Sequence, residues 1–327
     1  MAEISERERK KQQRQKMTKE EIGYLRRKGI ADRAVPIFRA FILIGLGFVI
    51  MYPLIYMVSC AFRERRDMSD PTVMWIPRHF TFDIIRETID AMDFWHTLGT
   101  TLVLNIGCSV VQVLSCAVTG YGFARFNFRG KKLLFGIVIL MILVPTQIIS
   151  LPLYSQFRYF GIKGLLSVNL IDTKLTMYLP ALTANGIRSG LMILIYRQFF
   201  RGLPKELEDA AYIDGCGAFM TFVRVMIPNA ASSFLTVFLF SVVWYWNDYY
   251  VSSTFFVDTR TIALMLTNLE SELNMRLFNK PNLNINPREQ IVWKEAGCLI
   301  CITPLLVMYT FMQKHFTEGI ERSGIVG

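Results

Sequence analysis

Long apolar runs separated by short polar segments dominate the pattern of this 327-residue chain. A helix needs about 20 mainly apolar residues to cross the hydrocarbon core of a bilayer, and it satisfies its backbone hydrogen bonds within itself. The pattern therefore predicts an all-α polytopic membrane protein with six transmembrane helices. We expect these spans at residues 37–62, 97–124, 132–157, 175–198, 225–250 and 294–314.

The composition agrees with this class, because hydrophobic residues make up 52% of the chain. A transmembrane β-barrel would instead show segments of about ten residues with alternating polarity, which are absent from the sequence. The net charge of +10 indicates the orientation, since Lys and Arg accumulate in cytoplasmic loops. With both termini inside, the inner segments are strongly basic and the outer segments nearly neutral. We therefore expect residues 1–36 to form a basic cytoplasmic segment and residues 37–327 to form the transmembrane domain.

The basic N-terminal segment has other interpretations. A nucleic-acid-binding arm would also be basic, but attraction to anionic lipid explains basic residues before a first span without a nucleic acid. A secretory signal peptide would have a shorter basic region followed by a small-residue cleavage site. We expect membrane lipid, and no nucleic acid, as the partner of this segment. Residues 20–35 suit either an amphipathic helix on the inner surface or a solvated tail.

A polar segment at residues 201–228 separates the fourth and fifth expected spans. Glu208 and Asp209 would stabilise the positive N-terminal end of a helix. Ala210 and Ala211 are strong helix formers with little bulk, so another surface can approach them closely. These features predict a short helix that is accessible to a partner.

Two kinds of residue frame this short helix. Gly215 lets the backbone turn or approach another surface, and Pro204 and Pro228 flank the segment. An ordinary amphipathic loop helix would share the acidic first turn. The combination of all these features between two spans favours a docking segment.

This segment resembles the EAA loop in the permease subunits of ABC importers. In that loop an acidic residue, two alanines and a glycine recur at fixed spacing, followed by an apolar element with proline. The present chain has Asp209 where Glu is usual, with Glu208 beside it, and Ile227 where Leu is usual. The resemblance implies that Glu208, Asp209, Ala210, Ala211, Gly215 and Pro228 couple the chain to an ATPase.

The resemblance extends from about residue 37 to the end of the chain. It is closest to the carbohydrate (maltose-type) binding-protein-dependent permeases, especially the second of their two paired permeases. Residues 119–132, 143–154 and 313–327 resemble that family's first cytoplasmic turn, proline-containing third span and C-terminal tail. The resemblance implies a type I ABC importer permease fold in a bacterial or archaeal cytoplasmic membrane. It also implies a second homologous permease, an ABC ATPase dimer and an extracytoplasmic substrate-binding protein as partners.

Catalytic motifs are missing from the sequence. It has no G-x-x-x-x-G-K-[ST] phosphate loop, and no nucleophile elbow or metalloprotease motif. We therefore expect no enzyme activity and no cofactor in this chain, with ATP and Mg bound by the partner ATPase. Cys298 and Cys301 form a C-x-x-C pair within an apolar run, which favours packing over a metal or redox role.

One charged residue, Arg188, lies near the middle of an expected span. Arg188 is costly at that depth unless it faces water or a partner. Asn185, Gly186 and Gly190 around it permit a bent helix with free carbonyls, as at a site that lines a transport path. A structural contact between helices, including one with a second permease, would explain Arg188 equally well.

The second candidate for substrate contact is the aromatic run at 244–250. Trp244, Trp246 and Asn247 combine apolar faces with a polar amide, which suits sugars. An interfacial aromatic belt has the same composition. The resemblance implies import of a sugar or oligosaccharide by alternating access. The same machinery importing a peptide or polyamine is the alternative, and a secondary carrier is a distant one.

Overall fold

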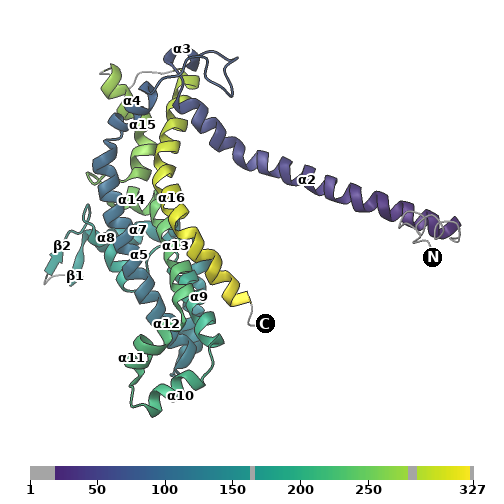
Figure 1. Cartoon of the computed structure of the whole chain (residues 1–327). Coiled ribbons are helices and arrows are strands. Elements are labelled where there is room, and N and C mark those ends of the chain that lie inside the picture. The colour runs from purple at the N-terminus through teal and green to yellow at the C-terminus, as the bar shows by residue number, and fades with distance from the viewer. Residues whose placement is uncertain (1–18, 163–165, 279–285, 325–327) are drawn as a thin grey trace, which may run out of the picture. The chain divides into compact units, whose positions relative to one another are not determined.

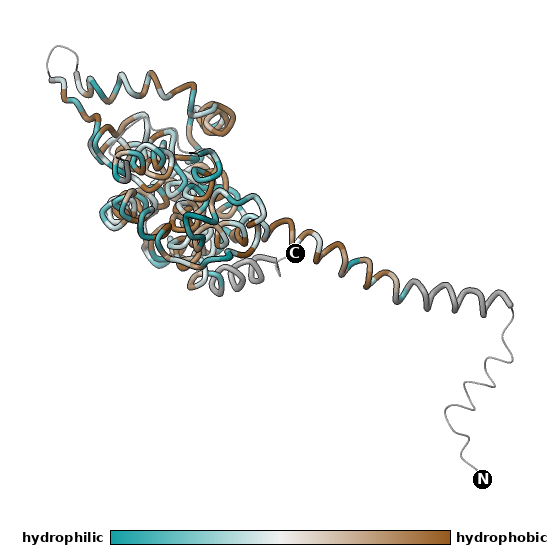
Figure 2. Tube along the Cα trace, turned by 90° about the horizontal axis from the view of Figure 1, so that it is seen from above, coloured by the Kyte–Doolittle hydropathy of each residue, from teal (hydrophilic) through white to brown (hydrophobic). Residues whose placement is uncertain are grey.

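The computed structural model describes residues 19–162, 166–278 and 286–324. Its contacts divide the chain into two compact units, residues 1–57 and 58–327. The first unit contains most of helix α2 (Lys19–Ala61), which is 43 residues long. Residues 34–61 of this helix are apolar and most of their side chains are exposed; Figure 2 shows this apolar stretch in brown. Residues 20–35 continue the same helix, so no break separates a surface helix from the span.

The second unit contains the remaining helices and one hairpin. Strands β1 (Phe160–Ile162) and β2 (Leu166–Val168) pair antiparallel. The longer helices are α4 (Asp83–Ala91), α5 (Phe94–Arg125), α6 (Lys131–Leu143), α7 (Thr146–Arg158), α8 (Leu175–Leu182), α9 (Ser189–Gly202), α10 (Glu206–Ile213), α13 (Ala231–Trp246), α15 (Ile262–Phe278) and α16 (Pro287–Gly324). The shorter ones are α3 (Arg65–Met68), α11 (Ala218–Thr221), the π-helical turn η1 (Phe222–Met226), α12 (Ile227–Asn229) and α14 (Tyr250–Phe255). Within this unit, α3 and α4 lie at one end and α10 and α11 at the other (Figure 1).

Among the described residues, three helices are long and apolar enough to cross a membrane, namely α2, α5 and α16. The number rises to five if each of two bent pairs is one span: α6 with α7, and residues 218–229 with α13. The expected fourth span at 175–198 does not pass this test, because it consists of two shorter helices, α8 and α9, with a break between them. The count of six expected from hydropathy is therefore not reached by helix length alone.

Two expected spans bend sharply. Helices α6 and α7 meet at 106°, where Pro145 keeps the residue before it out of the helical conformation. The expected fifth span at 225–250 begins as a straight helix only at Ala231, after a bend of 81°. Pro228 lacks the N–H that would continue the hydrogen bonds of the preceding turn. Hydropathy missed both bends because apolar residues lie on both sides of each one.

Helix α5 is the centre of the second unit and packs against α8, α9 and α13. Gly120 lets α9 approach closely, since a Cβ there would lie 2.6 Å from the Cβ of Tyr196. Tyr196 and Phe200 are fully buried at this contact. Because lipid is as apolar as these side chains, close packing rather than the hydrophobic effect favours the association. The result is a rigid pair of helices at the core of the unit.

Candidate functional site

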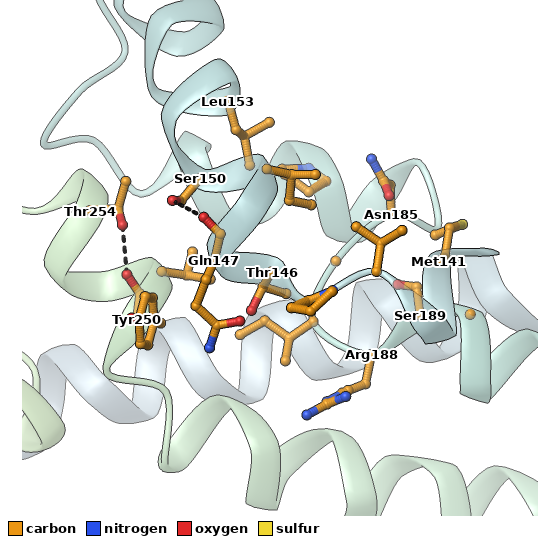
Figure 3. Close-up of a pocket in the computed structure, with 18 of the residues that line it drawn as sticks. Met141, Thr146, Gln147, Ser150, Leu153, Asn185, Arg188, Ser189, Tyr250 and Thr254 are labelled. Carbon is orange, nitrogen blue, oxygen red and sulfur yellow. Dashed lines mark hydrogen bonds between the residues drawn. The ribbon is translucent and has the colours of Figure 1, made fainter. Parts of the chain in front are cut away.

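The second unit has a cavity of about 510 Å³ where interruptions in several helices meet (Figure 3). Its walls come from the α6–α7 bend, the break between α8 and α9, and helix α14. Tyr245 near the end of α13 completes the lining. Irregular backbone at membrane depth is tolerated where it lines such a cavity or is buried in protein. The helix breaks thus have a position consistent with a binding site.

The α6–α7 bend supplies polar groups to the cavity. Thr146, Gln147 and Ser150 occupy the first turns of α7, immediately after Pro145. The Ser150 hydroxyl donates to the backbone carbonyl of Gln147 at 2.8 Å, as drawn in Figure 3. This bond does not involve the amide side chain of Gln147. The other side of the bend, from Ile137 to Val144, is apolar. The cavity is therefore amphipathic.

A buried network holds the break between α8 and α9. Gln112 of α5 donates through Nε2 to the Ile187 carbonyl at 2.6 Å. The Tyr245 hydroxyl donates to Oε1 of the same glutamine. Gly186 is needed here, because a Cβ would collide with the Tyr245 hydroxyl at 2.5 Å. The Ile187 carbonyl, which has no helical partner because of the break, is therefore bonded to Gln112, and this contact fixes the cavity wall.

A carboxylate fixes the opposite wall. The Asp172 amide donates to the Phe255 carbonyl at 2.9 Å, and Phe255 lines the cavity. Oδ1 of Asp172 accepts from the amides of Val257, Asp258 and Thr259 at 3.0–3.2 Å. Burial alone would raise the pKa of Asp172, but these hydrogen bonds outweigh burial, so the pKa is lowered. Asp172 therefore stays ionised and joins the two loops.

Two of the five residues predicted for substrate contact line this cavity. Asn185 and Arg188 both lie in the break before α9. Arg188 has a left-handed backbone (φ 56°), which is uncommon for a residue other than glycine. Its side chain is exposed and makes no hydrogen bond or ion pair with the part of the chain that the structure describes.

The other three predicted residues lie outside the cavity lining. Trp246 is only 5% exposed, and its indole N–H donates to the Cys301 carbonyl of α16 at 3.2 Å. Trp244 stacks on Phe240, and the Asn247 amide donates to a carbonyl one turn earlier in its own helix. In this subunit these residues stabilise helix packing. Their proposed contact with substrate stays a prediction.

The aromatic run at 244–250 was predicted to contact substrate through Trp244, Trp246 and Asn247, but the members of this run that line the cavity are Tyr245 and Tyr250. The signal was available in the helical spacing. Residues two apart on a helix point in nearly opposite directions, so Trp244 and Trp246 cannot share one face, and Tyr245 lies between them.

The polar segment at 201–228 forms a compact set of short helices. Glu208 of α10 is 8% exposed and accepts a hydrogen bond from the Tyr121 hydroxyl at 2.8 Å. Its second oxygen lies 3.1 Å from Nε of Arg125. Arg125 also donates to the Leu203 carbonyl at 2.7 Å. Because Tyr121 and Arg125 belong to the last turns of α5, these contacts attach α10 to the central helix of the unit.

The remaining predicted coupling residues differ in exposure. Asp209, Ala210 and Pro228 are exposed, whereas the side chain of Ala211 is buried. Gly215 is also exposed, with φ of 81°, and a Cβ added there would meet no atom within 4 Å. A left-handed backbone, rather than crowding, therefore requires glycine here. The sequence treated Glu208 and Asp209 as interchangeable, but only Glu208 is bonded inward.

An exposed apolar surface surrounds this segment. Ile213 is 86% exposed and Phe219 is 74% exposed. We call the α10–α11 patch the surface made by Tyr212, Ile213, Phe219, Met220 and Val223. Contiguous exposed apolar side chains mark protein contact sites. No group of three or more metal-binding side chains occurs in the described residues.

Membrane-spanning helices, a cavity made from broken helices and a separate exposed docking segment together define a membrane transport subunit. Residues 117–322 match the family described as "binding-protein-dependent transport system inner membrane component", and the chain belongs to this family. It is accordingly a multi-pass cytoplasmic membrane protein and a permease subunit of an ABC importer. Family members are not enzymes themselves, and their ATPase is a separate subunit.

Curated relatives match over nearly their full length. The arabinooligosaccharides transport system permease protein AraQ of Halalkalibacterium halodurans is 25% identical, over 86% of this chain and 93% of its own. Protein LplC of Bacillus subtilis is 26% identical, over 91% and 96%. The polygalacturonan/rhamnogalacturonan transport system permease protein YtcP of Bacillus subtilis is 23% identical, over 88% and 99%.

A solved structure shows the same fold. A chain of a bacterial ABC transporter involved in alginate import superposes with a TM-score of 0.68, at 20% sequence identity. The match covers 88% of the present chain and 98% of that chain. The protein therefore has the type I ABC importer permease fold.

Proposed function

We propose that this chain forms half of the translocation path of an ATP-driven importer for a sugar or oligosaccharide. Its expected partners are a second homologous permease, an ATPase dimer that binds ATP and Mg, and an extracytoplasmic substrate-binding protein. The family match carries the importer assignment, and relatives named for arabinooligosaccharides and diacetylchitobiose support the substrate class. We place both termini, and the α10–α11 patch, on the cytoplasmic side of a bacterial or archaeal membrane.

In this proposal six helical segments cross the membrane. The pair α8 and α9 acts as one interrupted span, and each bent pair acts as another. Interrupted helices are a recurrent way to build a substrate site near the middle of a membrane. The break before α9 would then lie inside the translocation path, where it supplies backbone and side-chain polar groups.

Alternating access follows from how the two regions are connected. ATP binding closes the partner ATPase dimer and moves the docked helix α10. The ion pair between Glu208 and Arg125 passes that movement to α5. Gln112 on α5 holds the break at Ile187, so a shift of α5 changes the cavity wall. Hydrolysis then returns the path to its inward-facing arrangement.

The cavity chemistry supports a sugar. Tyr245 and Tyr250 supply aromatic surface, which suits the C–H faces of a sugar ring. Thr146, Gln147 and Asn185 supply donors and acceptors for hydroxyl groups. The volume of about 510 Å³ lies within the usual range for small-molecule sites. The second permease would contribute the other half.

Two alternatives are weaker. A cationic polyamine would need carboxylates in the path, and no Asp or Glu lines the cavity. A peptide remains the alternative cargo for the same machinery. A secondary carrier would work without an ATPase, and it would leave the exposed α10–α11 patch without a partner.

Mass spectrometry of proteins that co-purify with the tagged chain from gently solubilised membranes tests the proposal. We expect a second permease and an ATPase, and the binding protein encoded beside them can then be screened against sugars. A variant with Ile213→Glu and Phe219→Glu tests the α10–α11 patch in the same experiment. It should lose the ATPase but keep the second permease. Recovery of the folded chain alone would contradict the importer assignment.

A further inference from the structure

The cavity carries a single formal charge, and that charge is positive. Arg188 is the only Lys, Arg, Asp, Glu or His among the residues that line it. A lone cation at membrane depth costs several kcal/mol unless it faces water or an anion. The remaining polar groups of the lining are neutral amides and hydroxyls. The cavity therefore favours an anion electrostatically.

The start of α9 adds to this preference. Arg188 is the N-cap residue of a helix of 14 residues, whose N-terminal end has positive partial charge. A cation at that end does not stabilise the helix, so helix stability gives no reason for an arginine there. Its neighbour Ser189 lines the same cavity.

The side chains around Arg188 are arranged for a polar ligand. Figure 3 shows the Gln147 amide and the Arg188 guanidinium extending to the same side of the α6–α7 bend. Asn185 lies three residues before Arg188 and is exposed. No residue of the described chain competes for the guanidinium.

We propose that the substrate is an acidic sugar, and that Arg188 binds its carboxylate. The planar fork of arginine matches a carboxylate with two parallel hydrogen bonds. Gln147, Asn185 and Thr146 are then left for the hydroxyl groups of the ring. An oligosaccharide that contains a uronic acid has this combination of one carboxylate and many hydroxyls per residue. The inference rests on the proposed sugar import and names its substrate class.

Uptake by the complete transporter in cells tests this proposal. Oligogalacturonate serves as the acidic probe and xylo-oligosaccharide of equal length as the neutral probe. We expect uptake of the acidic probe, a loss of roughly ten- to a hundredfold in Arg188→Gln, and partial retention in Arg188→Lys. Arg86→Gln is the matched control, because Arg86 is exposed on α4, away from the cavity, and should leave uptake unchanged.

Other outcomes separate the two proposals. Uptake of the neutral probe only, unaffected by Arg188→Gln, would overturn the acidic substrate and leave sugar import intact. If Arg188→Gln instead abolishes co-purification of the second permease, Arg188 is an interface contact and the inference is wrong. If neither probe enters and neither stimulates ATP hydrolysis across a wider panel of acidic and neutral sugars, the proposed sugar import itself fails.

Discussion

The docking segment and the cavity are built in opposite ways. The docking segment is one stretch of chain, residues 201–228, and the buried ion pair between Glu208 and Arg125, together with hydrogen bonds to Tyr121 and Arg125, attaches it to α5. The cavity gathers residues from α6 to α14 that lie more than 100 positions apart, and hydrogen bonds of Gln112 and of the Asp172 carboxylate hold its walls. The contacts of the docking segment are concentrated at one end of α5, whereas those of the cavity wall are distributed over several elements. The difference explains why one region forms a recognisable sequence motif and the other does not.

Both regions are attached to the same helix. Arg125 and Gln112 lie 13 positions apart on α5, which corresponds to about 20 Å of helix. Gly120 between them is a point of close packing against α9. A helix packed this tightly moves as a rigid body, so a displacement at Arg125 reaches Gln112. Variants that damage one attachment and spare the other therefore test whether the two regions have separate roles.

The largest effect is expected from Gly215→Leu, which should reduce uptake to background. The left-handed backbone at Gly215 costs an L-residue about 1–2 kcal/mol, and the new side chain would project from the exposed tip of the docking segment. Membrane insertion should be normal, because Gly215 lies outside the packed helices. The measurement is uptake normalised to the amount of folded protein in the membrane.

Gly217→Ala is the matched control for that variant. Gly217 has an ordinary extended backbone (φ −76°), and a Cβ there would also meet no atom within 4 Å. Uptake close to that of the unchanged protein is expected. Equal losses in both variants would mean that bulk anywhere in this loop is harmful, and the special role of the Gly215 backbone would be wrong.

The next largest effect is expected from Glu208→Ala. This change leaves the Arg125 guanidinium, which is 8% exposed, without its carboxylate, and breaking such a pair costs about 3–5 kcal/mol. Helix α10 should detach, so uptake falls sharply and the segment becomes sensitive to limited proteolysis. Tyr121→Phe removes only one hydrogen bond to the carboxylate and should cost less, about 1.5–3 kcal/mol.

Glu206→Ala is the control for Glu208, since it removes an exposed carboxylate from the same helix. It should leave both uptake and proteolysis unchanged. Asp209→Ala distinguishes the two neighbouring carboxylates, because Asp209 is exposed. We expect Asp209→Ala to weaken ATPase binding while the segment stays resistant to protease. Protease sensitivity in Asp209→Ala would contradict the division between an inward and an outward carboxylate.

The sequence predicted the docking segment well because its information is local. An acidic first turn, two alanines and a glycine at fixed spacing specify a short helix and its turn without reference to distant residues. What the sequence left open was which carboxylate is buried. That choice depends on Tyr121 and Arg125, which lie more than 80 positions away, and no local pattern reveals such a pairing.

The cavity was predicted only in part for a related reason. Arg188 stood out as a charge inside an apolar run, and Gly186 suggested a break, so both could be found by inspection. The bends at Pro145 and Ala230 were missed because hydropathy averages over apolar residues on both sides of them. Within the 244–250 run Tyr245 was not singled out, because an aromatic cluster looks the same whether it packs, lies in an interface or lines a cavity.

An intermediate effect is expected from Gln112→Leu. The change leaves the Ile187 carbonyl and the Tyr245 hydroxyl without their shared partner, and each such buried group costs about 1–3 kcal/mol. The break before α9 should loosen, which lowers the apparent affinity for substrate more than it lowers ATPase docking. Uptake kinetics and ATPase co-purification measure the two effects separately.

Tyr245→Phe tests the same network with a smaller change. Alone, Tyr245→Phe removes one hydrogen bond. In the Gln112→Leu background it should cost less stability than in the unchanged protein, because the two residues are partners. Strictly additive losses in stability would show that the network does not act as a unit. Loss of ATPase binding in Gln112→Leu would contradict the separation of cavity and docking segment.

The smallest effect is expected from Trp246→Phe. The indole N–H donates to the Cys301 carbonyl, and its loss should cost about 1 kcal/mol of thermal stability while the aromatic ring continues to fill the contact with α16. The apparent KM for uptake should not change, because Trp246 lies outside the cavity lining. Asn247→Ala, which removes a bond within its own helix, should have no measurable effect on either quantity. A raised KM in Trp246→Phe with unchanged stability would indicate that Trp246 contacts the substrate. It would then contradict the distinction between Trp246, which packs against α16, and Tyr245, which lines the cavity.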